Sequence, residues 1–378
     1  MITEELKKLY CTYTGHEPGT IEELPSSGSN RRYFRLTGTP TLIGVSGTSL
    51  EENQAFLYMA DHFRKKGLPV PQVVAKSDND AFYLQEDLGD TLLFNAIEKG
   101  RKTSVFDEEE KQLLRKTMRL LPAVQFSGAD GMNFSYCYPQ SEFNSRSILW
   151  DLNYFKYCFL KATGMEFQED RLEDDFLKMA DVLMRSSSAT FMYRDFQSRN
   201  VMIKEGEPWL IDFQGGRKGP VYYDVASFLW QAKANYPDSL RKELLKEYLD
   251  SLCKYQPVDE KYFYAQLRHF VLFRTMQVLG AYGFRGYFPV VFQEADDRFI
   301  QSGERFVTVV LAGIVHRTAV EYETTSVSAG IFGNAFLICK AGNFHNKTAF
   351  LQIVSELFQF GKFFQYMAEV RIFGIRFL

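Results

Sequence analysis

The sequence lacks the features that would place it in several large classes of protein. Its five cysteines, at positions 11, 137, 158, 253 and 339, show no paired spacing, so neither a disulfide framework nor a cysteine-based metal site is expected. No apolar run approaches the roughly 20 residues of a membrane-spanning helix. The best candidates, 306–315 and 331–339, are too short. Internal repeats and low-complexity tracts are absent as well.

An excess of charge of one sign is also missing. The 44 Lys and Arg residues nearly balance the 47 Asp and Glu residues, for a formal net charge of −3. Such a chain has no general attraction for nucleic acid or for an anionic membrane. With 46% hydrophobic and 24% charged residues, the 378-residue chain is an ordinary globular protein, long enough for two lobes. Scattered thiols and a charged first segment, unlike a signal peptide, predict a cytoplasmic protein of undetermined oligomeric state.

Periodicity predicts a small α+β region followed by a mostly helical one. The first region contains a predicted helix over 50–66 and predicted strands within 21–36, 41–45, 72–75 and 81–86. The second region begins after 87–90, and its predicted helices are 108–125, 145–163, 172–186, 224–234, 237–255 and 261–282.

One stretch of the chain carries a recognisable chemistry, Tyr193-Arg194-Asp195-Phe196-Gln197-Ser198-Arg199-Asn200, followed by Ile211-Asp212-Phe213-Gln214. Between them, two short apolar runs flank a turn-forming segment, which predicts a hairpin with Asn200 and Asp212 side by side at its base. Phosphoryl transfer needs a carboxylate that orients the attacking hydroxyl, and Mg²⁺ prefers hard oxygen ligands. The spacing therefore predicts Asp195 as the catalytic carboxylate and Asn200 and Asp212 as metal ligands. Taken singly, each could instead cap a turn or end a strand.

These residues resemble the aminoglycoside phosphotransferase and choline kinase family, which shares the protein-kinase architecture. The resemblance covers about 21–287, with Tyr193 where the family has His in its His-x-Asp-x-x-x-x-Asn loop. Within the family, the run RDFQSRNVM…IDFQ…GPVYYDVASFL is most similar to bacterial kinases that phosphorylate the anomeric hydroxyl of N-acetylmuramate or N-acetylglucosamine. The resemblance implies a two-lobed, protein-kinase-like α+β fold that uses ATP and Mg²⁺. It has a small β-rich N-lobe (1–88) and a larger, mostly helical C-lobe (89–287).

The nucleotide is expected to contact the N-lobe at two places. Small residues at the tip of the first hairpin, Ser27, Gly28 and Ser29, would let backbone amides approach phosphate oxygens, although an ordinary hairpin is the alternative. The resemblance implies that adenine binds backbone groups of the hinge, where Glu86 and Leu88 are the candidates. A plain linker is the alternative there.

A lysine that kinase folds place on the third strand is missing from this chain. The expected strand, 41–45, reads Thr-Leu-Ile-Gly-Val. Arg31, Arg32 or Arg35 could supply the positive charge, and Arg35 is preferred because strand alternation would turn it toward the nucleotide.

Two charged residues in or near the motif, Arg199 and Asp224, could each have a catalytic or a structural role. Arg199 could stabilise charge on the transferred phosphoryl group, or it could pair with a neighbouring carboxylate. Asp224 precedes an apolar helical run and is interpreted as an N-cap. In this interpretation it supports residues 193–200, the catalytic loop, and takes no part in the reaction.

The substrate pocket is expected in the helical lobe. Polar groups on one helical face with a Gly-rich end could bind hydroxyl, acetamido or carboxylate groups of a sugar; they are Arg274, Gln277 and Arg285. The arginines argue against a cationic aminoglycoside. Aromatic residues could stack on a sugar ring or simply pack between helices; they are Trp150, Tyr154 and Tyr157.

The sequence thus predicts an ATP- and Mg²⁺-dependent kinase that phosphorylates a hydroxyl of a small molecule, preferably an amino sugar. No nucleic-acid or membrane partner is expected. The alternatives are a nucleotide-binding pseudokinase or regulatory module, motivated by the missing lysine, and an aminoglycoside- or choline-type kinase. The Phe-rich segment 288–378 is interpreted as a C-terminal extension or an aberrant terminus, without an assigned role.

Overall fold

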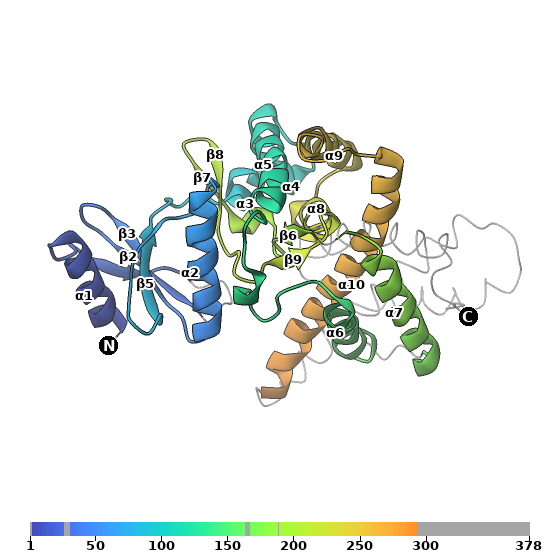
Figure 1. Cartoon of the computed structure of the whole chain (residues 1–378), viewed down its shortest axis with the longest axis horizontal. Helices are drawn as coiled ribbons and strands as arrows, with labels where there is room; N and C mark the ends of the chain where they lie inside the picture. Colours follow the sequence, from blue (N-terminus) through green and yellow to red (C-terminus); the bar gives the residue numbers. More distant parts are fainter. Residues whose placement is uncertain (1, 26–30, 163–166, 188, 293–378) are drawn as a thin grey trace, which may run out of the picture. The chain divides into compact units, whose positions relative to one another are not determined.

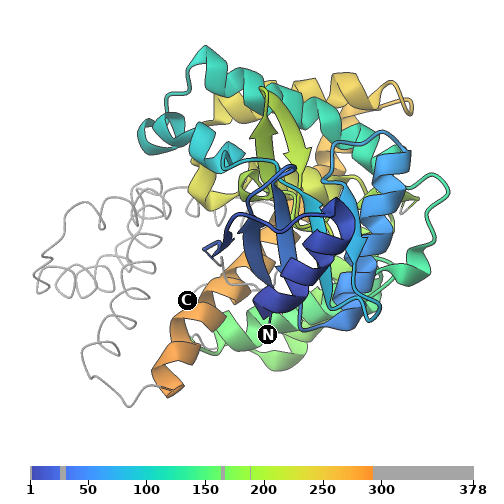
Figure 2. The ribbon, with the colours of Figure 1, turned by 90° about the vertical axis from the view of Figure 1, so that its left-hand side faces the viewer.

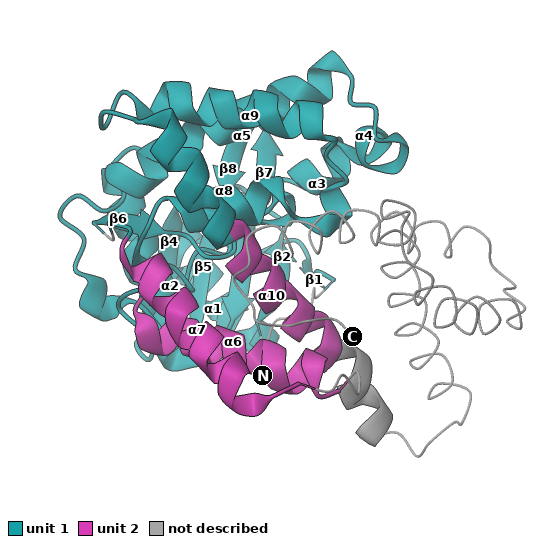
Figure 3. Cartoon of the chain, turned by 90° about the vertical axis from the view of Figure 1, so that its right-hand side faces the viewer, with its two compact units in different colours: residues 1–143, 186–270 teal, residues 144–185, 271–378 magenta. Residues whose placement is uncertain are grey.

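The computed structural model describes residues 2–25, 31–162, 167–187 and 189–292 (Figure 1). These residues form two compact units, which Figure 3 distinguishes by colour. Unit 1 comprises 1–143 and 186–270, and unit 2 comprises 144–185 and the described residues from 271 onward. This division differs from the boundaries expected at 88 and 287, which stay predictions. Most of the Phe-rich segment, from 293 on, lies outside the described residues.

Unit 1 begins with a five-stranded antiparallel sheet in the order β1-β2-β3-β5-β4 (Figures 1 and 2). Helix α1 (Ile2–Thr14) covers one face with Leu6 and Tyr10. Gly44 permits this packing, because a Cβ atom there would lie 2.8 Å from the Leu36 side chain and 3.0 Å from that of Leu6. The strands are β1 (Ile21–Glu23), β2 (Arg32–Leu36), β3 (Leu42–Ser46), β4 (Val73–Lys76) and β5 (Phe82–Glu86).

Helix α2 (Leu50–Lys65) covers the opposite face of the sheet (Figure 1). It begins at the N-cap Ser49, whose hydroxyl accepts a hydrogen bond from Glu52 N at 3.3 Å, as serine commonly does at this position. Its buried stripe includes Phe56, which stacks on Tyr83 of β5 with ring centroids 5.2 Å apart. The chain leaves the helix through Gly67, whose φ of 73° suits glycine.

The rest of unit 1 is mainly helical and holds two short two-stranded sheets. Helix α5 starts with a capping box formed by Asp107 and Glu110, and it packs along α9. The helices are α3 (Leu93–Ala96), α4 (Glu98–Thr103), α5 (Glu108–Phe126), η1 (Phe134–Tyr136), η3 (Ser198–Asn200), α8 (Tyr222–Leu229), η4 (Ala232–Ala234) and α9 (Asp238–Leu252). The strands are β6 (Thr190–Met192) paired with β9 (Arg217–Gly219), and β7 (Val201–Lys204) paired with β8 (Glu207–Leu210).

Unit 2 contains α6 (Ser145–Phe155), a π-helical turn η2 (Lys156–Leu160), α7 (Glu169–Met184) and the later part of α10 (Glu260–Phe292). Two glycines explain how α10 approaches α6 and η2 closely. A Cβ atom at Gly280 would lie 2.9 Å from the Tyr154 ring, and one at Gly283 would lie 2.0 Å from Cys158 O. The Gly-rich end of this helix is therefore a packing feature.

The antiparallel sheet followed by helices confirms the predicted α+β class. The helix expected over 145–163 ends at Phe155 and continues as the π-helical turn, while α10 extends ten residues beyond the expected end at 282. No described helix combines the length and apolarity needed to cross a bilayer, and the four described cysteines are free.

Candidate active site

The hairpin β7–β8 positions the two predicted metal ligands. Val201 pairs with Leu210, and beyond this pair Ile211 N donates to Asn200 O at 3.1 Å. Asp212 follows directly, so the base of the hairpin brings Asn200 and Asp212 together as predicted. The opposite end is a two-residue turn.

A hydrogen bond to the backbone of Asp195 holds that residue next to Asn200 and Asp212. Asn200 Nδ2 donates to Asp195 O at 2.8 Å, which fixes the loop between them. A Cβ atom at Gly215 would lie 3.9 Å from Asp195 Oδ2, so the Asp195 carboxylate faces the backbone three residues after Asp212. The structure therefore brings Asp195, Asn200 and Asp212 into one constellation.

Asp212 has a half-buried carboxylate and a left-handed backbone, at a φ of 66°. Burial raises its pKa, and the charge of Asp195 raises it further. A hydrogen bond from Gln214 Nε2 to Asp212 Oδ1, at 2.6 Å, lowers the pKa, as does the charge of Arg31. A divalent cation would relieve the repulsion between the two carboxylates.

Tyr193 occupies the position where the resembled family has histidine. Its buried phenol donates to the Ile211 carbonyl oxygen, which ties the catalytic loop to the end of β8. Burial raises the pKa of Tyr193, so the phenol stays protonated as this donor requires. Tyr193 thus supports the loop by a contact of its own.

Asp224 supports the same loop from the first turn of α8. Its fully buried carboxylate accepts hydrogen bonds from Tyr193 N and Arg194 N, each at 2.9 Å. The supporting role is confirmed. The N-cap interpretation is wrong, because α8 begins two residues earlier, at Tyr222, and its N-cap is Val221.

Arg31 provides a buried cation near Asp212 where the strand lysine is missing. Its Nη2 donates to Glu52 O at 3.0 Å and lies 3.7 Å from Glu52 Oε1 on α2. Its guanidinium lies 5.4 Å from the centroid of the Phe56 ring. That ring stacks at 4.8 Å on Phe213, the neighbour of Asp212. Contacts through Glu52 and Phe56 of α2 thereby link Arg31 to Phe213, which follows Asp212.

Arg35 has different partners from those expected. It does face away from the α1 side of the sheet, as alternation predicts, since Phe34 belongs to the α1 cluster. Its guanidinium pairs with Asp87 at 2.7 Å and with Asp90 at 2.8 Å, both at the hinge. A nucleotide contact by Arg35 stays a prediction, and the cation near Asp212 is Arg31.

The hinge candidates lie where the sheet passes into the helical part of unit 1. Glu86 N donates to Gln72 O at 2.8 Å, and the Glu86 carboxylate pairs with Lys204 of β7 at 2.6 Å. Leu88 is buried. Adenine contacts by Glu86 and Leu88 stay predictions, and Ser27, Gly28 and Ser29 lie outside the described residues.

Arg199 is exposed beside the catalytic loop. Its guanidinium lies 5.9 Å from the Phe94 ring centroid, and that of Arg101 lies 3.4 Å from the same centroid. Among the described residues no carboxylate pairs with Arg199, so the ion-pair alternative is not realised there.

The predicted sugar contacts belong to unit 2. The Arg274 guanidinium donates to the Gln277 carboxamide, and Arg274 is buried. Arg285 lies in α10, but its side chain is outside the described part. Trp150 and Tyr157 are exposed, whereas Tyr154 lies against Phe284 at 5.9 Å. Substrate contacts by these residues stay predictions.

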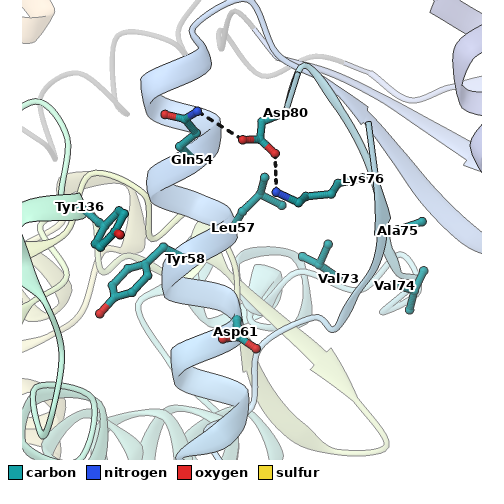
Figure 4. Close-up of a pocket in the computed structure, with 10 residues that line it drawn as sticks. All are labelled: Gln54, Leu57, Tyr58, Asp61, Val73, Val74, Ala75, Lys76, Asp80 and Tyr136. Atoms are coloured by element: carbon teal, nitrogen blue, oxygen red, sulfur yellow. Dashed lines mark hydrogen bonds and ion pairs between the residues drawn. The ribbon is translucent and has the colours of Figure 1, made fainter. Parts of the chain in front are cut away.

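A separate hollow of ≈ 590 Å³ lies between α2 and β4 (Figure 4). Asp80 at its rim pairs with Lys76 at 2.6 Å and accepts from Gln54 at 3.2 Å. None of its lining residues belongs to the predicted site.

The sequence did not reveal two contacts near Asp212: the pairing of Arg31, one of three candidate cations, with Glu52, and the hydrogen bond from Gln214. Gln214 stands inside the motif, two residues after Asp212. That spacing was its only signal, because its contact depends on the folded turn.

The fold defines the class of protein. The structure is similar to that of the amicoumacin kinase hAmiN in complex with AMP-PNP, Ca²⁺ and Ami, with a TM-score of 0.54 and 12% identity. The match covers 80% of this chain and 91% of that chain. At this identity the likeness shows the fold alone, which is protein-kinase-like.

Sequence comparison identifies the family. The model of the phosphotransferase enzyme family matches residues 20–260, so the chain belongs to that family.

Two curated relatives are both named N-acetylmuramate/N-acetylglucosamine kinase. The one from Pseudomonas aeruginosa is 25% identical over 61% of this chain and 65% of its own length. The one from Neisseria meningitidis serogroup B is 24% identical over 73% of this chain and 80% of its own length. The chain thus spans slightly less than two thirds of the Pseudomonas relative.

Proposed function

We propose that the protein is an ATP- and Mg²⁺-dependent kinase that phosphorylates a hydroxyl of an amino sugar of the N-acetylmuramate or N-acetylglucosamine type. The observation that carries this proposal is the meeting of Asp195, Asn200 and Asp212 at the base of one hairpin. The family supports phosphoryl transfer. The names of the two relatives support the amino-sugar class.

The donor set fits a magnesium ion that is held partly by the nucleotide. The described residues contain no group of three or more His, Cys, Asp or Glu that could hold a metal by themselves. They do contain a half-buried carboxylate at Asp212 and a buried carboxamide at Asn200, and Mg²⁺ takes its remaining oxygens from phosphates and water. When bound, Mg²⁺·ATP supplies the transferable γ-phosphoryl group and neutralises charge that develops on its oxygens.

In this proposal each residue of the loop has one task. Asp195 accepts a hydrogen bond from the sugar hydroxyl, orients its oxygen toward the phosphoryl group and receives its proton. Asn200 and Asp212 hold the metal, and Tyr193 and Asp224 keep the loop in place. Arg199, an exposed residue of the same loop, stabilises charge on the transferred group in this scheme.

Arg31 takes the place of the missing strand lysine in this scheme. It pairs with Glu52 of α2 and its charge acts on Asp212, as expected of a cation that links the helix to the nucleotide site. Arginine keeps its charge even when buried and can bind phosphate through two N–H groups. Its presence weakens the motive for the pseudokinase alternative.

The test is a panel of acceptors with purified protein and Mg²⁺·ATP. Product formation is measured with N-acetylmuramate, N-acetylglucosamine, choline and an aminoglycoside. We expect phosphorylation of one or both amino sugars. Asp195→Ala should lower kcat by at least about 10²-fold, because general-base catalysis is worth that much or more. The mutant should still bind ATP.

Two results would count against the proposal. Unchanged turnover in Asp195→Ala would refute the role of Asp195. ATP binding by the wild-type protein without transfer to any acceptor of the panel would instead favour the regulatory module.

A further inference from the structure

Gln214 has a buried carboxamide of which only one end is satisfied. The side chain is 7% exposed. Its Nε2 donates to Asp212 Oδ1 at 2.6 Å, which fixes the orientation of the amide because a carboxylate can only accept there. No donor among the described residues reaches the other end, Oε1, although that atom is also buried. A buried acceptor without a donor destabilises the fold, so its retention calls for an explanation.

The missing donor must lie close to the proposed metal site. Oε1 and Nε2 share one planar amide, so Oε1 is within roughly 5 Å of Asp212 Oδ1. Asp195 also lies near Asp212, since its charge acts on that residue and its Oδ2 would lie 3.9 Å from a Cβ atom at Gly215, the residue after Gln214. Two carboxylates and an amide oxygen are thus gathered near Asp212, and all three attract a cation or the O–H groups around it.

A water molecule on a magnesium ion satisfies these requirements best. Mg²⁺ keeps several of its waters when proteins bind it, at about 2.0–2.1 Å, and each bound water presents two strongly polarised O–H donors. Groups that accept from metal-bound waters or hold metal ligands in place commonly tune the affinity for the ion. An amide oxygen is neutral, so it adds an acceptor without adding a third negative charge beside Asp212 and Asp195.

We propose that Gln214 is a positioning residue that acts with both ends of its amide, holding Asp212 through Nε2–H and accepting a hydrogen bond at Oε1 from a water on the bound magnesium ion. This inference rests on the proposed function and adds to it a contact that determines metal affinity. Loss of such outer contacts typically weakens metal binding by 10–100-fold.

The experiment measures binding of Mn²⁺, as a probe for Mg²⁺, to the full chain with saturating AMP-PNP, by electron paramagnetic resonance of the free ion. Gln214→Leu removes both ends of the amide, whereas Gln214→Glu keeps an oxygen at Oε1 and removes the donor to Asp212. Gln54→Leu on α2, away from the constellation, is the matched control. Circular dichroism verifies that each variant folds, and Gln214→Ala, which also removes both ends of the amide, replaces Gln214→Leu if that variant does not fold.

We expect Gln214→Leu to weaken Mn²⁺ binding by at least about 10-fold. Gln214→Glu should bind the ion as tightly as the wild type or more tightly, because its added negative charge offsets the lost donor to Asp212. Equal weakening in both variants would mean that only the donor end matters, and unchanged binding in Gln214→Leu would mean that neither does. Both results overturn the proposal.

Broadening of the Mn²⁺ signal by oxygen-17-labelled water counts the waters on the ion. An unchanged count in Gln214→Leu supports the water contact. One extra water would identify Oε1 as a direct ligand and overturn it. If the wild type binds no Mn²⁺ with AMP-PNP, the proposed function itself fails, a result distinct from any loss confined to Gln214 variants.

Discussion

At the scale of single residues, Asp224 shows how burial and hydrogen bonding oppose each other beneath the catalytic loop. Its carboxylate has no exposed surface, and burial is the main reason that its pKa is raised from 3.8 to about 7. The backbone N–H groups of Tyr193 and Arg194 act in the other direction, while the charge of Asp195 raises the pKa further. The ionised Asp224 carboxylate accepts hydrogen bonds from the loop more strongly, whereas burying the neutral carboxyl costs less free energy.

The raised pKa of Asp224 predicts how the stability of the protein depends on pH. The folded-state pKa lies above the unfolded value, so the stabilisation by protonated Asp224 is complete below about pH 4 and lost as pH rises toward 7. Asp224→Asn has no such titration. The free energy of unfolding of the wild type, relative to Asp224→Asn, should therefore fall between pH 4 and pH 7, by up to about 4 kcal/mol. Urea unfolding of both proteins over this range measures the difference, and parallel curves would contradict the assignment.

Residues whose roles follow from local spacing could be predicted from the sequence. Asp195, Asn200 and Asp212 meet because one short hairpin joins them. Arg35 was placed on the correct face of its strand by alternation, but its partners Asp87 and Asp90 come from a segment more than fifty residues away. No local pattern encodes that pairing.

At the scale of elements, the β7–β8 turn is a local determinant of the site. Lys204 pairs with Glu207, and between them Glu205 and Gly206 have φ values of 54° and 74°. This two-residue turn with positive φ at both positions matches the twist of the strands, and it favours Asn or Gly at each position. Glu205 is therefore in a conformation that its side chain disfavours, whereas Gly206 is not.

Substitutions at these neighbouring positions should have opposite effects. Gly206→Ala should destabilise the protein by about 1 kcal/mol through backbone strain alone, since nothing lies within 4 Å of an added Cβ atom. Glu205→Asn should stabilise it by about 0.5 kcal/mol. Denaturant midpoints measure both changes. Activity should stay near that of the wild type, because the turn is at the far end from Asn200 and Asp212. Destabilisation by both substitutions would contradict the assigned turn.

Elements with a clear period were predicted well, and short or interrupted ones were not. Helices α2 and α5 begin and end within two residues of the expected bounds because capping residues and an apolar stripe mark them. The short α3 and α4 have no such stripe, and β6 and β9 pair only three residues each across a long separation. The π-helical turn after α6 lies where the backbone at Cys158 meets Gly283 of α10, a contact that the sequence does not reveal.

At the scale of the whole molecule, the proposed nucleotide site joins parts of unit 1 that are distant in the chain. Arg31 precedes β2, Glu52 belongs to α2, and Asp212 follows β8. The stacking of the Phe56 ring on the Phe213 ring, with centroids 4.8 Å apart, already connects α2 to the neighbour of Asp212. A ligand that contacts all three segments must be lost before unit 1 unfolds, so it should stabilise the unit as a whole.

This linkage can be measured as a thermal shift with Mg²⁺·AMP-PNP. At a concentration 100-fold above Kd, the ligand should add about 2.7 kcal/mol and raise Tm by about 5–10 °C. Arg31→Met should bind at least about 10-fold more weakly and lose part of the shift, because a charge-assisted phosphate contact is worth about 1.5–3 kcal/mol. Arg32→Met is the matched control, since Arg32 is an exposed residue that pairs with Glu23 at 2.6 Å. A full shift in Arg31→Met would show that another group holds the phosphates. Because Asp195→Ala should keep the whole shift while losing turnover, the two variants together separate nucleotide binding from phosphoryl transfer.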